Sequence, residues 1–417
     1  MKAFIQIAVL ETRRLVRSKA AAALMIASAA WMFAFPHLVK SDGTADGTRE
    51  LYVHYSLGGV FALCLLALAA SAAGSLSRER EEKRLQLSAV RPVRLFAIAL
   101  ARTLALTAVG AATIAIACAI LVFRTGISRP CDSVISPIME SPRQEAERMY
   151  DFFMASPETP EEAKKAGRET VLRLLEQRAF DNYQTIPAGK SERWSFAAPK
   201  EGSFAVRLRF TNDFDMRQDV LGRFSAEGLS GAISNITQSV VKVPLAGGRT
   251  RGGEMSLRFN NDGATSLMLR PRRDIQLLVR ADAFGWNLVR AYVELVSILA
   301  LVTAFGVFLG AALGRSVAVF TIISAIIVTF VSSDVLEQYP DQLEEDRTDR
   351  IGLAITRAVE RTTRPAASLR PLAALSADER VEPGEASVAF AVNALLFPIF
   401  LAFLSGFAIA KKEPSSC

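Results

Sequence analysis

The chain has 417 residues, of which 51% are hydrophobic, and its 49 Lys and Arg against 42 Asp and Glu give a formal net charge of +7. This hydrophobic share is high for a soluble protein of this size, so the distribution of apolar residues decides the class of protein. The basic charge comes with no nucleic-acid recognition motif. We therefore exclude nucleic acid as a partner and attribute much of the charge to attraction to anionic lipid headgroups.

Long uncharged windows recur along the chain. A helix needs about 20 apolar residues to cross the ~30 Å hydrocarbon core of a bilayer, and helices buried in soluble cores rarely have wholly apolar runs of that length. The windows that meet or nearly meet this length are 20–39, 51–76, 103–123, 295–314, 316–333 and 386–410. The sequence therefore predicts an α-helical polytopic membrane protein with six transmembrane helices, of which the fourth and fifth form a tight hairpin.

Lysine and arginine gather at one set of span ends. They precede the first span, lie between the second and third and between the fourth and fifth, and follow the sixth. With six spans these regions fall on one side, which the positive-inside rule identifies as cytoplasmic. We expect a multi-pass protein of the cell inner (cytoplasmic) membrane with a cytoplasmic N-terminal helix over 1–19 and a cytoplasmic tail over 411–417. A cleaved signal peptide is the alternative, because Ala27, Ser28 and Ala29 resemble a cleavage site.

The opposite side receives a short loop, a long insert over 124–285 between the third and fourth spans, and the segment 334–385. The insert begins with two predicted helices, each with a proline at its start: Pro142 to about Phe153, and Pro160 to about Arg178. Short alternating runs such as "SFAVRLRF" and "EMSLRFNN" follow, and alternation of this kind is typical of antiparallel strands. We therefore predict an extracytoplasmic α+β insert, two helices and then a β-sandwich. Cys131 is its one cysteine, which indicates no disulfide framework.

The charged run "SREREEKRLQLSAVRPVR", residues 77–94, joins the second and third spans. Its residues are good helix formers, and the four-residue spacing of Glu79 and Lys83 places them on one helical face. Pro92 limits the helix because the residue before a proline avoids the helical region. Judged from charge alone, the run would only end two spans and hold the loop in water; its residue order indicates more.

This run resembles the cytoplasmic coupling helix of type 2 ABC exporter permeases, which begins with serine, arginine and glutamate and ends near a proline. The stretch "ETRRLVRSKAAA", residues 11–22, is similar to the amphipathic helix that precedes the first span in that family. Ile351, Ile355 and Val359, at helical spacing, resemble the family's short external helices. The resemblance covers a little over half of the chain, and the long insert departs from the family's short external loop.

The resemblance implies an ABC exporter permease that works with a separate ATP-binding subunit and with a second permease copy or paralogue. ATP and Mg would be bound by the partner subunit, since this chain has no phosphate-loop motif. We therefore expect a transporter subunit, not an enzyme, with no cofactor of its own. The residues implied at the ATPase-coupling interface are Arg78, Glu79, Arg80, Glu81, Glu82, Lys83, Leu85 and Pro92.

Arg290 and Glu294 stand four residues apart near the outer start of the fourth span, where they can form an intramembrane charge pair. The alternative is that both side chains reach the membrane surface. His37 and His54 have no further ligands at metal-binding spacing, and no nucleophile motif is present. Two other functions remain open. The chain could be a membrane-anchored extracytoplasmic module that binds a protein or ligand at the insert without transport, or, less favoured, an intramembrane enzyme.

Overall fold

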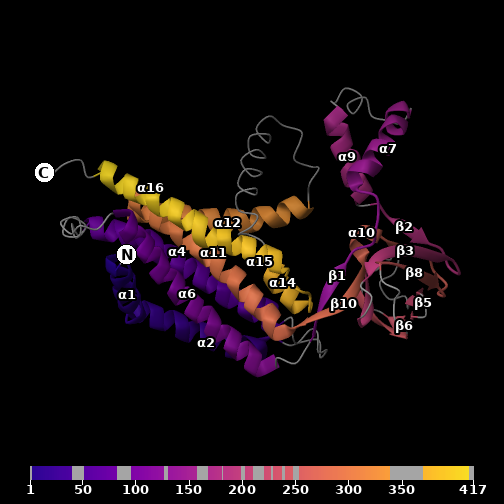
Figure 1. The fold of residues 1–417 in the computed structure, drawn as a ribbon, viewed down its shortest axis with the longest axis horizontal. Coiled ribbons are helices and arrows are strands. Elements are labelled where there is room, and N and C mark those ends of the chain that lie inside the picture. Colours follow the sequence, from indigo (N-terminus) through magenta and orange to yellow (C-terminus); the bar gives the residue numbers. More distant parts are fainter. Residues whose placement is uncertain are drawn as a thin grey trace. The chain divides into compact units, whose positions relative to one another are not determined.

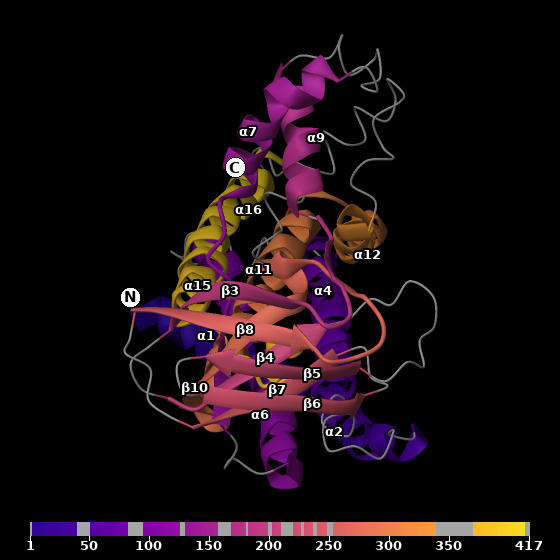
Figure 2. The ribbon, with the colours of Figure 1, turned by 90° about the vertical axis from the view of Figure 1, so that its right-hand side faces the viewer.

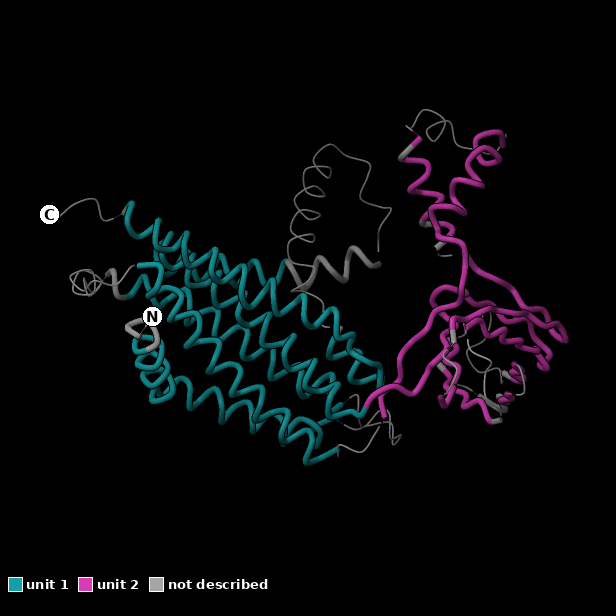
Figure 3. The backbone as a smooth tube through the Cα atoms, in the orientation of Figure 1, with its two compact units in different colours: residues 1–129, 283–417 teal, residues 130–282 magenta. Residues whose placement is uncertain are grey.

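The computed structural model describes residues 2–39, 51–81, 95–125, 130–156, 168–180, 182–198, 202–209, 220–226, 229–236, 240–247, 253–338 and 370–412. The chain forms two compact units, which Figure 3 distinguishes by colour. One unit, here called the helix bundle, combines residues 1–129 with 283–417. The other, here called the insert, contains residues 130–282. These bounds fall within the predicted insert over 124–285.

Helices make up the helix bundle (Figure 1). Its elements are α1 (Lys2–Val16), α2 (Lys19–Leu38), η1 (Leu51–Leu57), α4 (Gly58–Glu81), α6 (Leu95–Thr125), α11 (Phe284–Ala312), α12 (Arg315–Gln338), α14 (Arg370–Ser376), α15 (Pro383–Ala389), η2 (Phe390–Leu396) and α16 (Phe397–Lys412). Five stretches of the described chain are long and apolar enough to cross a membrane: Lys19–Leu38, Leu51–Arg78, Leu95–Thr125, Phe284–Ala312 and Pro383–Lys411. The chain is therefore a multi-pass membrane protein.

The remaining predicted span, 316–333, lies in α12. The apolar stretch identified in this helix, Arg315–Val328, is shorter than a span, so the count of six stays a prediction. α12 packs against α4 and α11. Ile351, Ile355 and Val359, the predicted external amphipathic face, lie outside the described residues.

Two helices begin earlier than their uncharged windows. α6 starts at Leu95 instead of 103, and α11 starts at Phe284 instead of 295. Consequently Arg102, Arg290 and Glu294 lie within helices and not at their ends. Helices packed against other helices can carry charged residues because neighbouring groups replace water.

The break between α1 and α2 is encoded locally. The hydroxyl of Ser18 accepts a hydrogen bond from the backbone N–H of Ala21 at 3.2 Å, which caps the first turn of α2. α1 has its basic residues Arg13 and Arg14 in its last turn, where they complement the helix dipole. The predicted N-terminal helix over 1–19 is thus a separate element from the first span.

The insert contains ten strands and three helices within the described residues. They are β1 (Pro130–Ile135), α7 (Pro142–Ala155), α9 (Arg168–Phe180), β2 (Gln184–Ile186), β3 (Ser191–Ala198), β4 (Phe204–Arg209), β5 (Val220–Ala226), β6 (Leu229–Ile236), β7 (Val240–Gly247), β8 (Gly253–Asn261), β9 (Leu267–Leu269), α10 (Pro271–Asp274) and β10 (Ile275–Ala283). The predicted α+β order is correct except that β1 precedes the helices.

Within the described residues eight strands form one continuous sheet in the order β1-β10-β4-β7-β6-β5-β8-β3, and β2 pairs with β9. Figure 2 shows strands β3, β8, β5 and β6 of this sheet running across the view. The predicted β-sandwich stays a prediction, and the described strands include one continuous eight-stranded sheet. Its two halves are joined by the short pairing of β6 with β7. Alternate residues such as Phe204 of β4 and Phe259 of β8 belong to one buried cluster, so both halves enclose a common core.

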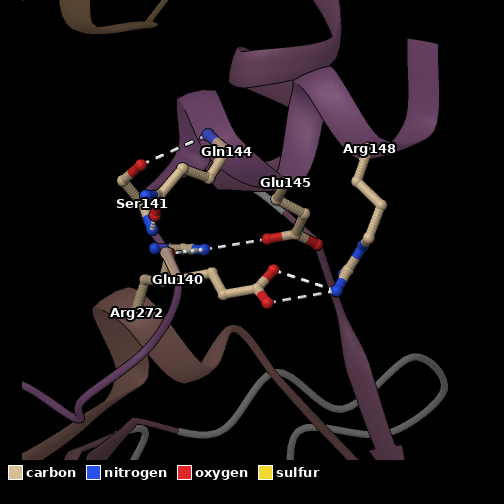
Figure 4. A network of polar contacts seen from close by, with 6 residues as sticks. All are labelled: Glu140, Ser141, Gln144, Glu145, Arg148 and Arg272. Carbon is tan, nitrogen blue, oxygen red and sulfur yellow. Dashed lines mark hydrogen bonds and ion pairs between the residues drawn. The ribbon is translucent and has the colours of Figure 1, made fainter.

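A polar network fixes the start of α7 (Figure 4). Ser141 and Gln144 form a capping box, in which each side chain bonds the other's backbone. Arg272 of α10 donates one hydrogen bond to the backbone oxygen of Glu140 at 2.7 Å and another to Glu145 at 2.8 Å. This network ties the α7–α9 pair, which has its own small apolar core, to the end of the sheet that carries α10.

Candidate functional site in the helix bundle

The predicted coupling run begins inside α4. This helix continues to Glu81, which agrees with the predicted helical start of the run, and Arg78 is exposed near its end. The other predicted interface residues, Glu82, Lys83, Leu85 and Pro92, lie outside the described residues. What the structure describes is therefore the helices that flank the run, α4 before it and α6 after it.

An ion pair joins α1 to α6. Arg102 of α6 lies 3.7 Å from the carboxylate of Glu11, and their side chains are only 7% and 20% exposed. Removing two charges from water is costly, so a pair this well shielded holds its partners in one arrangement more than it adds net stability. Glu11 is the first residue of the stretch "ETRRLVRSKAAA", and α1 packs along α6.

α11 is the central helix of the bundle, since it packs against α4, α6, α12, α16 and η2. One face carries Asn287, Arg290, Glu294 and Ser297, whose spacing of three or four residues repeats the helical period. Glu294 is 5% exposed, and it lies about 15 Å along the helix axis from Phe284. An ionisable residue buried within a membrane-spanning helix is a candidate for a functional position.

The structure places Arg290 and Glu294 on the same face of α11, as their spacing predicts. Arg290 is half-buried, Glu294 is buried, and each has an interaction partner. Side chains that reach the membrane surface remain the alternative for these two residues. Their pairing with each other stays a prediction.

Asn287 anchors the segment that precedes the last span. Its Nδ2 donates to the backbone oxygen of Glu379, and its Oδ1 accepts from the backbone N–H of Val381, both at 2.6 Å. The side chain is fully buried, so these two bonds satisfy both ends of its amide. Residues 379–381 are thereby held against the first turn of α11.

Polar contacts also bridge α6 and α11. The hydroxyls of Thr107 and Thr303 lie 3.0 Å apart, and the hydroxyl of Tyr292 donates to the backbone oxygen of Ala111 at 3.2 Å. Such interhelical hydrogen bonds contribute modestly, about 0.6 kcal/mol each on average in membranes. Together they set the register of α11 against α6.

α4 and α11 approach each other through residues without bulk. A Cβ atom on Gly310 would overlap the backbone oxygen of Ala73, and one on Gly306 would stand 2.8 Å from the Cβ of Ala72. Small residues four apart permit this close backbone approach between membrane helices. The GxxxG spacing of Gly306 and Gly310 is visible in the sequence, and it is the signal that would have found this interface.

Two stretches have π-helical hydrogen bonding, η1 before α4 and η2 before α16. Such stretches frequently mark functional positions in helices. η2 packs against α11 and contains Asn393, which is buried and has an interaction partner. Hydropathy does not predict the two π-helical stretches. It also does not single out Glu11, Asn287 or Asn393, because one polar residue hardly changes the mean hydropathy of a window.

Comparisons with known protein families, with curated proteins and with solved structures find no match. The site itself combines a buried carboxylate, buried amides and hydroxyls on helices that pack closely. Within the described residues no three His, Cys, Asp or Glu side chains gather as metal ligands would. The arrangement is suited to linking the movement of one helix to polar groups on another.

Proposed function

We propose that the chain is the membrane-spanning permease subunit of an ABC exporter in the cytoplasmic membrane, with both termini in the cytoplasm. α12 is then the sixth span, and the insert is extracytoplasmic. ATP and Mg are bound by a separate ATP-binding subunit, and a second permease copy or a paralogue completes the transporter. The proposal rests first on the resemblance of residues 11–22 and 77–94 to two segments of that family.

The observation that carries the proposal is the pairing of Glu11 with Arg102. It ties α1, whose last turns contain the start of the first resembling segment, to α6, which follows the second. Four of the coupling residues, Arg78 to Glu81, belong to α4, so a push on this segment acts on α4 and α6 together. Both helices pack on α11, and α4 does so through close contacts at Gly306 and Gly310. Displacement of the coupling segment is thereby passed to the polar face that carries Glu294.

The test is co-purification of this chain with the ATP-binding protein encoded beside it, followed by ATPase measurement in lipid. The variant Glu79→Lys with Glu81→Lys reverses two charges in the coupling segment, and interfacial charges set register and partner choice. We expect the complex to be lost or its hydrolysis uncoupled. The matched control is Asp151→Lys with Glu385→Lys, which makes the same change of charge at two exposed acidic residues elsewhere.

Equal co-purification and ATPase activity in both variants would contradict the coupling role. Failure of the wild-type chain to bind any ATP-binding protein would favour the second function, a membrane-anchored extracytoplasmic binding module. One observation supports that alternative: the insert forms a compact unit with a core of its own.

A further inference from the structure

A row of exposed polar residues crosses four neighbouring strands of the insert sheet. The register places Arg193 of β3 opposite Arg258 of β8. It also places Ser225 of β5 opposite Arg258, and Ser230 of β6 opposite Ser225. Residues directly opposite each other point to the same face of a sheet. The four side chains therefore share one face, where they line a shallow groove of about 550 Å³.

The two arginines in this groove lack a counter-charge within the described chain. Like charges directly opposite each other destabilise a sheet. Arg223, on the same face, is compensated by two contacts with Asp262, of 2.7 and 3.1 Å. By contrast, Arg193 and Arg258 form no ion pair or hydrogen bond with another described residue, and none of the described residues that line the groove is acidic.

Hydroxyl groups complete the lining. Ser256 lies two residues before Arg258 on β8 and so faces the same groove. Its Oγ is shielded from solvent and has no hydrogen-bond partner among the described residues. A shielded hydroxyl without a partner is unfavourable, and a ligand oxygen in the groove would satisfy it.

We propose that this groove binds the phosphate group of a soluble phosphate ester. Two guanidinium groups match the two negative charges of a phosphate monoester, and their forks bind its oxygens in pairs. With the hydroxyls of Ser225, Ser230 and Ser256, the groove offers more donors than the two oxygens of a carboxylate can use.

The remainder of the ester fits the rest of the groove. Its volume lies within the roughly 300–1,000 Å³ of small-molecule sites and exceeds what a bare phosphate fills. Among the described residues that line it, Ala226 and Leu229 are the only apolar ones, which leaves little surface for an acyl chain. These features favour a soluble ester over a phospholipid headgroup. The inference is independent of the exporter function, and its test requires no ATP-binding subunit.

The first test is calorimetric titration of the full chain, held in phosphatidylcholine nanodiscs, with glycerol 3-phosphate and with inorganic phosphate. Glycerol, which lacks the phosphate group, is the uncharged control ligand. We expect saturable binding of glycerol 3-phosphate, weakened at least about tenfold by Arg193→Gln or Arg258→Gln and lost in the double variant. The control is Arg209→Gln, because Arg209 is exposed on β4, which β7 and β6 separate from β5. This variant should bind like the wild type.

The proposal is overturned if the wild type shows no saturable binding, if the double variant binds as well as the wild type, or if Arg209→Gln weakens binding equally. Phosphatidic acid nanodiscs separate the lipid source. If the binding of glycerol 3-phosphate seen in phosphatidylcholine nanodiscs were lost in phosphatidic acid nanodiscs, the lipid headgroup would occupy the groove, and the soluble ester would be overturned.

Thermal unfolding gives a second readout. Without phosphate, Arg193→Gln should melt no lower than the wild type, because it removes a repulsion between opposed arginines. With glycerol 3-phosphate, the wild type should gain more stability than the variant, since only a ligand bound to the native state stabilises it. Equal gains in both proteins would contradict the proposed site.

Discussion

The helix bundle and the insert use opposite means to pack their cores. Where α4 meets α11, glycine and alanine bring two backbones together, and Gly310 has no room for one further carbon. In the insert, Trp194, Phe196, Phe224 and Phe259 fill a common core between the halves of the sheet. Lipid chains are as apolar as leucine, so membrane helices associate through close van der Waals contact, whereas large buried side chains stabilise a core that water would otherwise reach.

The comparison gives a rule that experiments can break. The helix bundle should be least tolerant of added volume, and the insert should be least tolerant of removed volume. Removing an ion pair should cost less stability than either of these changes, and it should cost least where both partners are exposed. The following substitutions test this order from the largest expected effect to the smallest.

Phe259→Ala should have the largest effect. Phe259 is fully buried, and its ring centroid lies 4.8 Å from that of Phe224. Removing a buried aromatic ring costs about 3–5 kcal/mol because a cavity remains. Hydrogen exchange of β5 and β8 in the full chain should accelerate accordingly. Leu221→Ala, at an exposed position of β5, is the control and should change exchange little; equal effects would break the rule.

Gly310→Ala is the reciprocal change in the helix bundle. The added carbon would meet the backbone of Ala73, and a backbone cannot move aside as a side chain can. We expect a loss at the upper end of overpacking penalties, about 3 kcal/mol, seen as a lower melting temperature and a smaller monodisperse fraction in detergent.

Gly314→Ala is the matched control for that glycine. It adds the same carbon four residues later, where no atom lies within 4 Å. This variant should behave like the wild type. If both glycine variants were equally stable, close packing of α4 on α11 would not be what holds the bundle together.

Glu11→Gln should cost less, about 1–2 kcal/mol. It leaves the shielded guanidinium of Arg102 without this carboxylate, but Glu11 is partly exposed, so the loss stays below that of a fully buried pair. Hydrogen exchange of α1 should rise selectively. Arg13→Gln changes an exposed charge on the same helix and is the control. Unchanged exchange in Glu11→Gln would show that apolar packing alone holds α1 on α6.

Sequence reasoning located most helices of the bundle because hydropathy averaged over a span is a strong signal. It misplaced the starts of α6 and α11 because it required uncharged windows, and Arg102, Arg290 and Glu294 are charges that packed helices accept. Their burial depends on neighbours that no local pattern reveals. The same holds for Asn287, whose two partners lie more than ninety residues away along the chain.

In the insert, alternation predicted antiparallel strands, but not their order. β3 pairs with β8, so Arg193 meets Arg258 across sixty-five residues of chain. The groove exists only once that register is known, because a shift of one residue would turn the arginines to the opposite face. The alternation of buried and exposed residues along one strand is a local property of the sequence, whereas the pairing of two strands depends on residues far apart in the chain.

Asp262→Asn should have the smallest effect, and it should depend on pH. The hydrogen bonds from Arg223 hold the pKa of Asp262 below its usual value, and both groups are exposed. A carboxylate with a lowered pKa contributes stability above its unfolded pKa of about 3.9, and the contribution is lost as pH falls through the lower folded value. At neutral pH we expect the melting temperature to fall by about one or two degrees, and the difference from the wild type to disappear in acid.

Arg223→Gln removes the other partner and should show the same loss at neutral pH and the same convergence in acid. Asp151→Asn, at an exposed residue of α7, supplies the control for a simple change of charge. A loss that persisted unchanged at low pH would mean that Asp262 acts through packing and not through its charge. A loss as large as that of Phe259→Ala would break the rule itself, because an exposed ion pair would then hold the sheet as firmly as its aromatic core.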